Sequence, residues 1–434
     1  MTAKSSIAEN ETRILSHLTG GDANHPGRNH VTAALDSFKH QGPNGLHLCL
    51  VSDVMSPSSG SIIKHMPSQL KPPFPQNRED PYRGRYSLTT AKSIMRQILL
   101  GLDFLHTHGV AHGDLQPGNI LFSVKSLSGY TEKNLVQPTM YAGFLDACCN
   151  DKEEVIFGHL DLGPGKGCYT GRFKDEIQRD SAPRYLVKRA PLHEHIDLDP
   201  LSVRISDFGA SFFISSPPSR PVTPLVLRSP ELILGEPINE KQDIWSFGCL
   251  LFEYLTATNL FFVLPPLWGP DERVEVQRAS GTVIVIQDGS PRYAEQRDDR
   301  LVSSGDPEAT EEAKDSMDID DETNDSHILQ IAQRLGPLPS SFTSRWPRAA
   351  TYFSENGDVV KNFVGELEPG EDEGEIPSLT CIEGFFDEHK GAEISDEDSS
   401  SAKSLLRLIL QVDAAKRPSA AEILAHPWFA EDNA

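Results

Sequence analysis

The sequence predicts an α+β fold that is mainly helical. Apolar residues recur at helical spacing in several long segments, and short apolar strands flank two polar loops, at residues 112–119 and 206–209. The chain has 434 residues, enough for a large core, but its hydrophobic fraction of 38% is below the usual range for globular chains. Part of the chain is therefore expected to lie outside the core.

In the first half of the chain, the apolar pattern alternates between the periods of helices and of strands. Ile94, Ile98 and Leu102 fall on one helical face, whereas apolar residues alternate in the segment 46–51. The predicted elements, in order, are a helix at 7–18, a strand at 46–51, a loop around a short helix at 56–86, a helix at 94–105 and a strand at 120–122.

The second half continues the helical pattern and contains two predicted insertions. Residues 123–200 show no clear period and mix glycine, proline and charge, and residues 265–326 form a second insertion that ends in an acidic run. The predicted elements around them are a strand at 203–205 and helices at 242–258, 328–335, 405–412 and 419–425.

The net charge of −23 comes from 40 basic and 63 acidic residues and is concentrated in two runs. Residues 306–325 contain ten acids and one base, and residues 366–398 contain thirteen acids and one base. Such runs are typical of solvated insertions without a fixed structure, which is what we expect of both. The acidic balance argues against direct binding of nucleic acid.

The cysteine pattern and the hydropathy indicate the compartment. Six cysteines occur without a CxxC pair or a partner histidine pattern, which favours reduced thiols over a disulfide scaffold or a zinc site. The most apolar stretch, residues 248–268, is interrupted by Glu253 and Asn259, so no membrane-spanning segment is expected. The start of the chain lacks the apolar core of a secretory signal. We therefore expect a protein of the cytoplasm, the nucleus or both.

The two polar loops carry the residue types that phosphoryl transfer needs. Asp114 and Asn119 stand five residues apart between a predicted helix and a predicted strand. An aspartate there can orient an attacking hydroxyl and accept its proton, and the amide oxygen of the asparagine can hold a magnesium ion. In the second loop, the Asp207 carboxylate can bridge magnesium to phosphate oxygens, and Gly209 permits a sharp turn.

Three further segments follow the second loop: Ser229-Pro-Glu231, then Asp243-Ile-Trp-Ser-Phe-Gly248 and, near the end, Arg417-Pro418. With these segments in this order, the chain resembles a eukaryotic protein kinase over about residues 7–122 and 201–429. It is most similar to the SR-protein kinase group. The segments that agree with this group are residues 11–15, 35–39, 42–45, 46–50, 98–106, 227–231, 335–339 and 426–428.

The resemblance implies roles for the residues of both loops. Asp114 would be the catalytic base, and Asn119 and Asp207 would hold Mg²⁺. For the nucleotide, a hinge at Asp53 to Met55 would give backbone hydrogen bonds to the adenine of ATP, and Leu121 would form the floor of the adenine pocket.

The other implied roles are structural: a stack of His112 with Phe208, a buried ion pair of Glu231 with Arg417 and a brace from Asp243 to the backbone of the first loop.

The function that the resemblance implies is that of a Ser/Thr protein kinase, which transfers the γ-phosphoryl group of ATP to protein hydroxyls with ATP and Mg²⁺ as cofactors. The similarity to the SR-protein kinase group suggests a basic, Arg/Ser-rich protein substrate. Two alternatives stay open: a pseudokinase or scaffold without catalysis, and a small-molecule phosphotransferase of the aminoglycoside or choline kinase type. The segments 229–231 and 243–248 form a peptide-substrate platform in the resembled fold and favour a protein substrate.

The chain departs from the kinase pattern in its first lobe. Glu11 corresponds to a glutamate that pairs with a lysine on a strand, but neither that strand nor a Gly-rich phosphate loop precedes it. We expect either an N-terminally truncated kinase or a degenerate one, of impaired activity and mainly the helical C-lobe. Apolar surface is expected to be exposed around Leu46, Leu48 and Leu50. The implied domains are a remnant of the N-lobe at 1–55 and a C-lobe at 56–429, with insertions at 123–200 and 265–326 and an acidic segment at 366–398.

Two substitutions distinguish the first loop from the kinase pattern. Gln116 replaces a lysine, which removes one cation near the transferring phosphoryl group, and Gly113 replaces an arginine. Without that arginine, a phosphorylated activation segment has no partner on this loop. Ser211 and Thr223 of that segment are therefore expected to be ordinary surface hydroxyls.

Overall fold

The computed structural model describes the chain in segments, and none of the helices in them combines the length and the hydropathy that crossing a lipid bilayer requires. The described segments are residues 6–42, 45–63, 70, 84–131, 157–161, 167–171, 186–187, 192, 195–198, 200–218, 222–263, 276–277, 283–284, 308–354, 359–361 and 379–429.

The helices and strands named below have the following bounds. The helices are α1 (Ser6–Thr19), α2 (Ser59–Ile62), α3 (Leu88–Thr107), α7 (Pro230–Ile233), α8 (Lys241–Thr256), α9 (Glu308–Leu335), α10 (Ser340–Thr343), α11 (Ala349–Tyr352), α12 (Ile382–His389), α13 (Asp396–Ile409) and α14 (Ala420–Leu424). The strands are β1 (Asp36–Gly42), β2 (Gly45–Val51), β3 (Met55–Ser58), β4 (Val110–Ala111), β5 (Ile120–Ser123), β6 (Phe157–Asp161), β7 (Gly167–Gly171), β8 (Leu186–Val187), β9 (Val203–Ile205), β10 (Phe212–Phe213), β11 (Val276–Gln277) and β12 (Val283–Ile284).

A small antiparallel sheet in the order β3-β5-β9 brings the two polar loops together. Ile120, the first residue of β5, pairs with Ile205, the last residue of β9. The loop before β5 and the loop after β9 therefore leave the sheet at the same edge. Asp114 and Asp207 are far apart in the sequence, and this register places their loops side by side.

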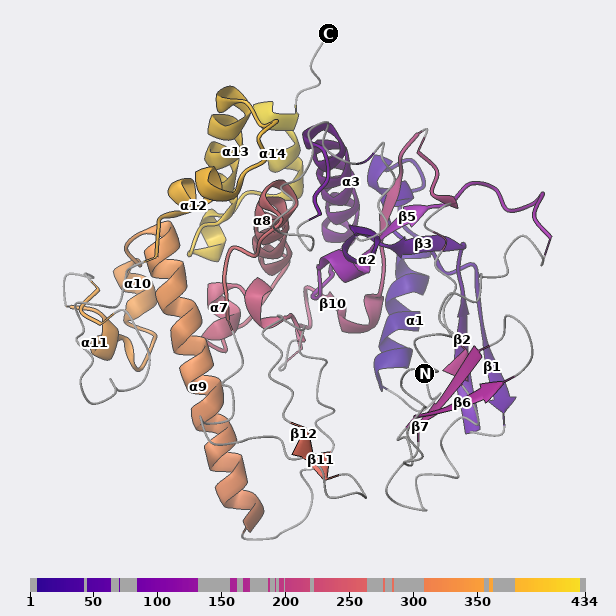
Figure 1. The fold of residues 1–434 in the computed structure, drawn as a ribbon, viewed down its shortest axis with the longest axis horizontal. Helices are drawn as coiled ribbons and strands as arrows, with labels where there is room; N and C mark the ends of the chain where they lie inside the picture. The colour runs from indigo at the N-terminus through magenta and orange to yellow at the C-terminus, as the bar shows by residue number, and fades with distance from the viewer. Residues whose placement is uncertain are drawn as a thin grey trace.

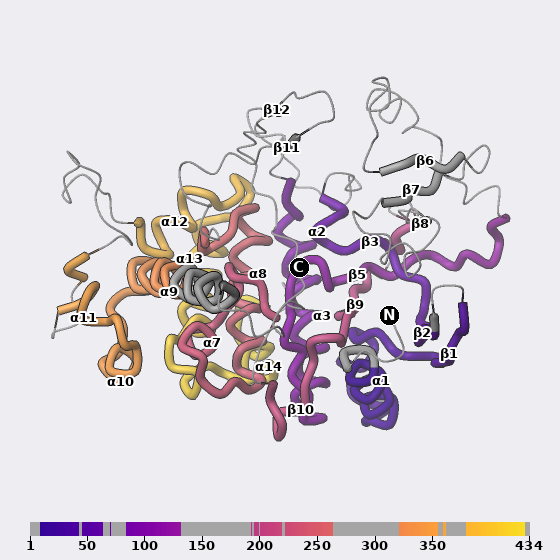
Figure 2. The backbone as a smooth tube through the Cα atoms, turned by 90° about the horizontal axis from the view of Figure 1, so that it is seen from below, coloured from indigo at the N-terminus to yellow at the C-terminus, as the bar shows by residue number. Residues whose placement is uncertain are grey.

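The sheet lies between two unequal parts of the molecule. Figure 2 shows α1 and the hairpin of β1 and β2 at one end and the helices α9 to α13 at the other. In Figure 1 the long helices α3 and α8 stand between the sheet and α13, in the middle of the molecule. The larger, helical part therefore lies on one side of the loops and the small strand-bearing part on the other.

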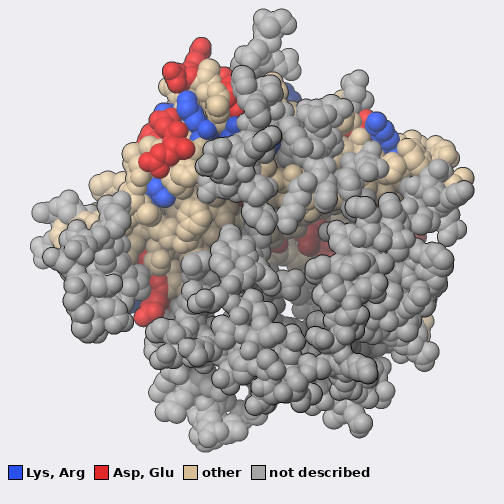
Figure 3. Space-filling model, viewed as in Figure 1, with Lys and Arg blue, Asp and Glu red and all other residues tan. Residues whose placement is uncertain are grey.

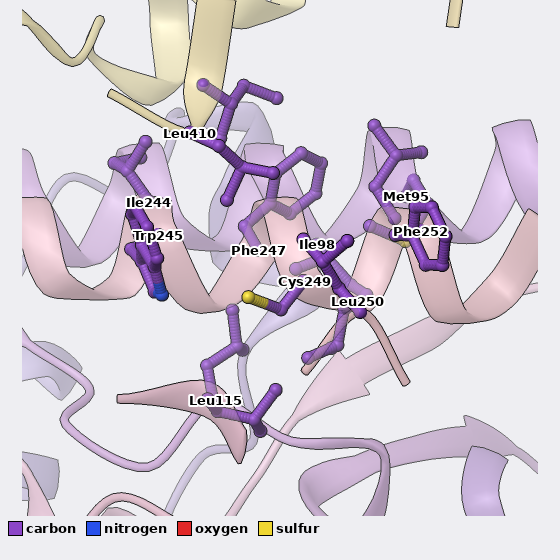
Figure 4. Close-up of a cluster of buried hydrophobic side chains, with 14 of the residues drawn as sticks. Met95, Ile98, Leu115, Ile244, Trp245, Phe247, Cys249, Leu250, Phe252 and Leu410 are labelled. Carbon is purple, nitrogen blue, oxygen red and sulfur yellow. The ribbon is translucent and has the colours of Figure 1, made fainter. Parts of the chain in front are cut away.

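The core of the helical part is built around α8. Nearly every residue of this helix is buried, and Trp245, Phe247 and Phe252 are among the largest fully buried side chains. Figure 4 shows these side chains with residues of α3 and the first loop. A Cβ added at Gly248 would lie 2.8 Å from atoms of Ile409, so glycine lets α13 approach α8 closely.

The main predicted elements are confirmed, with differences at their ends. The helices expected at 7–18, 94–105 and 242–258 correspond to α1, α3 and α8, and the strands expected at 46–51, 120–122 and 203–205 correspond to β2, β5 and β9. α13 begins at Asp396, before the first apolar residue of the expected helix at 405–412. Ser395 caps this start by accepting a hydrogen bond from the backbone of Asp398, a signal that apolar spacing does not contain.

Strand β1 is missing from the sequence-based prediction. It pairs with β2 from Asp36 opposite Val51 to Gly42 opposite Gly45. Almost all of its side chains are exposed, so β1 has no alternation of buried and exposed positions to detect. Leu46 is 40% exposed, as expected, but Leu48 and Leu50 are half-buried, and Leu50 packs against the core. The poor solubility that such surface favours stays a prediction.

The expectation that both acidic runs lack structure is wrong where the structure describes them. The first run lies largely within α9, which begins at Glu308. Asp325 is 2% exposed and accepts hydrogen bonds from Trp346 and Arg348 at 3.0 and 2.7 Å. Its burial is offset by these partners, which come from residues after the helix.

The described part of the second run, residues 379–398, forms α12 and the start of α13. Its acids pair with bases on other elements, and Figure 3 shows acidic and basic side chains intermixed at this corner of the molecule. The pairs are Glu383 with Arg407, Asp387 with Lys403 and Asp398 with Lys92. A sum of charges along the sequence cannot reveal such pairs, because each partner lies on a different part of the chain.

A buried histidine on α9 makes stability sensitive to acid. His327 is 1% exposed, packs edge-on against Phe261 and has a pKa lowered to about 3, mainly by burial. Because the folded pKa lies below the ordinary value of 6.5, the stabilisation is complete above pH 6.5 and is lost as the pH falls towards 3. Between these two pH values, we expect His327 to lower the free energy of unfolding by about 1.4 kcal/mol for each unit by which the pH falls.

The measurement is urea unfolding of the wild type and of His327→Phe between pH 6 and pH 4. The difference between the two proteins isolates His327, because the other titrating groups are common to both. His40→Phe, at an exposed position on β1, is the matched control and should follow the wild type. Parallel curves for the wild type and His327→Phe would contradict the expectation.

Candidate active site

A buried carboxylate on α8 holds the first loop in place. Asp243 is 1% exposed and accepts hydrogen bonds from the backbone nitrogens of His112 and Gly113, at 2.8 and 2.9 Å, and from His106 Nε2 at 2.9 Å. Burial by itself raises the pKa of Asp243, but the bond and charge of His106 and the backbone bonds outweigh it, so the pKa lies below its ordinary value. The expected brace from Asp243 is confirmed.

Asp114 lies in the first loop with both carboxylate oxygens hydrogen-bonded. Gln116 Nε2 donates to Oδ1 and Oδ2 at 2.9 and 2.8 Å, and Asn119 Nδ2 donates to Oδ2 at 2.9 Å. Burial raises the pKa of Asp114, the bonds from Gln116 and Asn119 lower it in part, and the charge of Asp207 raises it further. The outcome is a carboxylate with a raised pKa and a fixed orientation, suited to accepting a proton.

The second loop packs directly on the first. Phe208 is buried edge-on against the ring of His112, with the ring centroids 5.4 Å apart, so the expected stack is confirmed. Ser206 donates through Oγ to the carbonyl oxygen of Asn119 at 2.9 Å. Asp207 itself is exposed and has a φ of 67°, which turns the chain sharply after β9. The structure thus brings Asp207 next to Asp114 and Asn119.

The oxygen atoms of Asn119 and Asp207 suit a magnesium ion. Asn119 Nδ2 donates to the carbonyl and to the carboxylate of Asp114, which leaves its Oδ1 as an acceptor. Asp207 Oδ1 accepts from the Gly209 nitrogen at 3.3 Å, and Oδ2 is left for a ligand. Within the described residues, no cluster of three histidine, cysteine, aspartate or glutamate side chains could hold a metal. Phosphate oxygens and water would have to supply the other ligands of a magnesium ion held by Asn119 and Asp207.

Glu11 on α1 adds a third carboxylate to this region. It is 8% exposed, and its Oε2 has no hydrogen-bond partner among the described residues. Burial raises the pKa of Glu11, and the negative charge of Asp207 raises it further. In the described part of the chain, then, this glutamate has no paired lysine. The carboxylates of Glu11, Asp114 and Asp207 concentrate negative charge, which a divalent cation would offset.

The hinge residues lie at the start of β3. Met55 is half-buried and pairs with Ser123 on β5, and Leu121 is half-buried on the same strand. Asp53 is exposed, and its carboxylate pairs with Arg204 at 2.5 Å. The Asp53 side chain is therefore occupied by β9, which leaves its backbone as the part that a nucleotide could contact. The adenine contacts at Asp53, Met55 and Leu121 stay predictions.

Two hydroxyls of the segment after Asp207 hold the first loop, and neither contact was expected from the sequence. Ser211 is 1% exposed and donates to the carbonyl oxygen of His112 at 2.9 Å. Thr223 is 3% exposed and donates to the carbonyl oxygen of Gly113 at 2.7 Å. The expectation of surface hydroxyls is wrong, because a lone Ser or Thr carries no sign of the distant carbonyl that will bury it.

Gly113 sits where a side chain would be strained. Its φ is +81°, and an added Cβ would lie 2.6 Å from the carbonyl oxygen of Ala210. We expect Gly113→Ala to lower the free energy of unfolding by about 1–3 kcal/mol and to displace Asp114. Urea unfolding measures the first effect. Gly129→Ala, with open space around its Cβ, is the matched control and should change stability little. Equal unfolding curves for the two variants would contradict this expectation.

Comparisons with known proteins agree with this geometry. A family model described as "Protein kinase domain" matches residues 22–128 and 193–276. The chain carries a protein kinase domain. The matched residues include both polar loops, and the fold agrees with a crystal structure titled as a kinase domain, with a TM-score of 0.50 and 17% sequence identity over 98% of this chain and 83% of that one.

The relatives of this kinase domain are SR-protein-kinase-like Ser/Thr kinases. The Serine/threonine-protein kinase SRPK of Physarum polycephalum is 23% identical over 432 residues, which cover 98% of this chain and 76% of that protein. Protein kinase dsk1 of Schizosaccharomyces pombe is 25% identical over 308 residues, 58% of this chain and 53% of that protein. The similarity spans about half to three quarters of the length of these relatives.

An ion pair joins the matched part of the kinase domain to its C-terminal helices. The two terminal guanidinium nitrogens of Arg417, Nη1 and Nη2, bond to the carboxylate of Glu231 at 2.7 Å, and the Arg417 side chain has no exposed surface. The expected pair is confirmed. Arg417 also donates to the carbonyl oxygens of Gln411 and Lys241, so it fixes the end of α13 against α7 and the start of α8.

Proposed function

We propose that this kinase domain transfers the γ-phosphoryl group of ATP to Ser or Thr hydroxyls of a protein. The observation that carries the proposal is the meeting of Asp114, Asn119 and Asp207 at one edge of the sheet, with Asp114 held by two amide donors. Magnesium, when bound by Asn119 and Asp207, would neutralise charge on the phosphate oxygens.

The chain's own residues account for the handling of the hydroxyl. Asp114 accepts its proton, and its raised pKa strengthens it as a base near neutral pH. Asn119 and Gln116 keep the carboxylate from rotating, because each donates a hydrogen bond to it. Gln116 carries no charge, so it positions the base without stabilising the phosphoryl group as a lysine would.

For the substrate, we propose a basic, Arg/Ser-rich protein. The relatives carry the names SRPK and dsk1, and the net charge of this chain is −23, which favours encounter with a basic partner. The described cysteines, Cys49, Cys249 and Cys381, are free thiols, which supports the proposal of a location in the cytoplasm or the nucleus.

A second candidate function is that of a pseudokinase. The buried Oε2 of Glu11 has no partner in the described residues, and the lysine that would orient the phosphates in the kinase pattern is not among its contacts there. A site with this gap could hold a nucleotide without transferring its phosphoryl group efficiently, since positioning groups account for orders of magnitude in rate. The two functions differ in turnover and not in nucleotide binding.

The test measures binding and transfer separately. Thermal unfolding with and without Mg·ATP reports binding, and transfer of labelled phosphate to an Arg/Ser repeat peptide reports catalysis. For a kinase we expect both in the wild type, and loss of the magnesium-dependent shift in Asp207→Asn. Asp36→Asn, on the exposed strand β1, should behave as the wild type. Binding without transfer would indicate the pseudokinase, and equal results for the wild type and Asp207→Asn would overturn both.

A further inference from the structure

A pocket lies beside the hinge, away from the catalytic loops. It has a volume of about 310 Å³ and is lined by the hinge residues Asp53 to Met55, by Ser123 to Leu127 at the end of β5 and by Arg204 of β9. Leu121 and Ser123 stand two residues apart on the same face of β5. The pocket therefore adjoins the position proposed for adenine, although Leu121 and the catalytic residues do not line it.

The polar groups of this pocket have unused hydrogen-bonding capacity. Arg204 pairs with Asp53 through Nη1, but its Nε is buried and has no acceptor among the described residues. Lys125 is exposed, and in the described part of the chain no acidic side chain pairs with its Nζ. A buried donor without an acceptor is rare in a native protein and indicates a site for a ligand or ion. With one carboxylate against two cations, the pocket favours an anion.

The remaining wall combines apolar side chains with Ser123 and Ser126. Val54 is 57% exposed, and Met55 and Leu127 are half-buried around the same space. A pocket of this size with apolar walls and a few converging polar groups is typical of small-molecule sites. A small inorganic anion would leave the apolar wall exposed to water, whereas a molecule with an apolar body and one carboxylate would cover it.

We propose that this pocket binds a small carboxylate with an apolar body, beside the proposed nucleotide site, with which it shares the hinge residues Asp53 to Met55. The carboxylate bonds to the exposed Lys125 Nζ, beside the guanidinium of Arg204, and the body lies against Val54, Met55 and Leu127. Asp53 keeps its bond to Arg204 Nη1, so the ligand leaves the link between the hinge and β9 intact.

The test uses 2-naphthoate as the probe and neutral 2-naphthamide as its matched control, with binding followed by ligand-observed NMR on the full chain. We expect the carboxylate to bind and the amide to bind at least about tenfold more weakly, as for the loss of a charged hydrogen bond. Equal binding of the two compounds would overturn the proposal, since the anion would then be irrelevant.

Variants locate the bound probe. Lys125→Met should weaken binding of 2-naphthoate about tenfold, and Lys125→Arg should restore most of it, because the charge returns. Lys39→Met, on the exposed strand β1, should leave binding unchanged. Unchanged binding in Lys125→Met would overturn the proposal. So would lost binding in Asp207→Asn, which would place the probe in the nucleotide site. No arm of this test needs ATP, so its outcome is independent of the proposed kinase activity.

Discussion

Asp114→Asn is expected to lower the rate of phosphoryl transfer by about 10²- to 10⁴-fold. The amide has nearly the size of the carboxylate, and its oxygen can accept the bonds that Asn119 and Gln116 donate to Oδ2. Its nitrogen can accept neither the second bond from Gln116 nor the proton of the attacking hydroxyl. Most of the geometry is therefore retained while the base is lost. Steady-state phosphorylation of an Arg/Ser repeat peptide measures the effect.

The pH dependence of the wild type provides a check on this role. Burial raises the pKa of Asp114, so activity should decline as the pH falls through a value above the ordinary 3.8, where the base becomes protonated. Asp103, on α3, is partly buried and pairs with His25. Asp103→Asn is the control and should keep wild-type turnover. A fully active Asp114→Asn would show that Asp114 is not the base.

Arg417→Met is expected to lower the free energy of unfolding by about 3–5 kcal/mol. The substitution leaves the Glu231 carboxylate, with only 9% of its side chain exposed, without its cation. It also removes the donors to the carbonyl oxygens of Gln411 and Lys241. Urea unfolding of the two proteins at pH 7 measures the difference.

An exposed ion pair provides the matched control. Arg345 bonds to Glu236 at 2.5 Å, but its side chain is 51% exposed, so Arg345→Met should cost less than about 1 kcal/mol. Adding Glu231→Gln to Arg417→Met should recover part of the lost stability, because the unpaired buried charge is then gone. Similar losses for Arg345→Met and Arg417→Met would contradict the assignment of the effect to burial.

Residues in local, periodic segments were predictable. The apolar spacing of α3 and α8 and the alternation of β2 depend on burial of one face, and this leaves a trace within a few turns of chain. The first loop was recognisable for a similar reason, because Asp114 and Asn119 lie on one short segment with a required spacing. The roles of Asp243 and Arg417 followed from the kinase pattern, and their bonds are present.

Features that depend on distant partners were not predictable. Ser211 and Thr223 look like surface hydroxyls until the carbonyl oxygens of His112 and Gly113 are placed beside them. In the sequence, Asp325 is one of many acids in a run that resembles a solvated segment. In the structure it is buried and accepts hydrogen bonds from Trp346 and Arg348. In each case the deciding partner comes from another part of the chain.

The amino-acid sequence was sufficient for the kinase pattern, the main helices and the candidate catalytic residues, since these depend on residue type and short spacing. The relative position of the two loops and the order of the acidic segments depend on contacts between distant parts of the chain. The pairing of β5 with β9 brings Asp207 to Asp114. The ion pairs between α12 and α13 hold acidic residues in ordered helices, although their sequence resembles a solvated run. The physical reason is that burial and charge pairing are properties of neighbours in space, and the sequence records only neighbours along the chain.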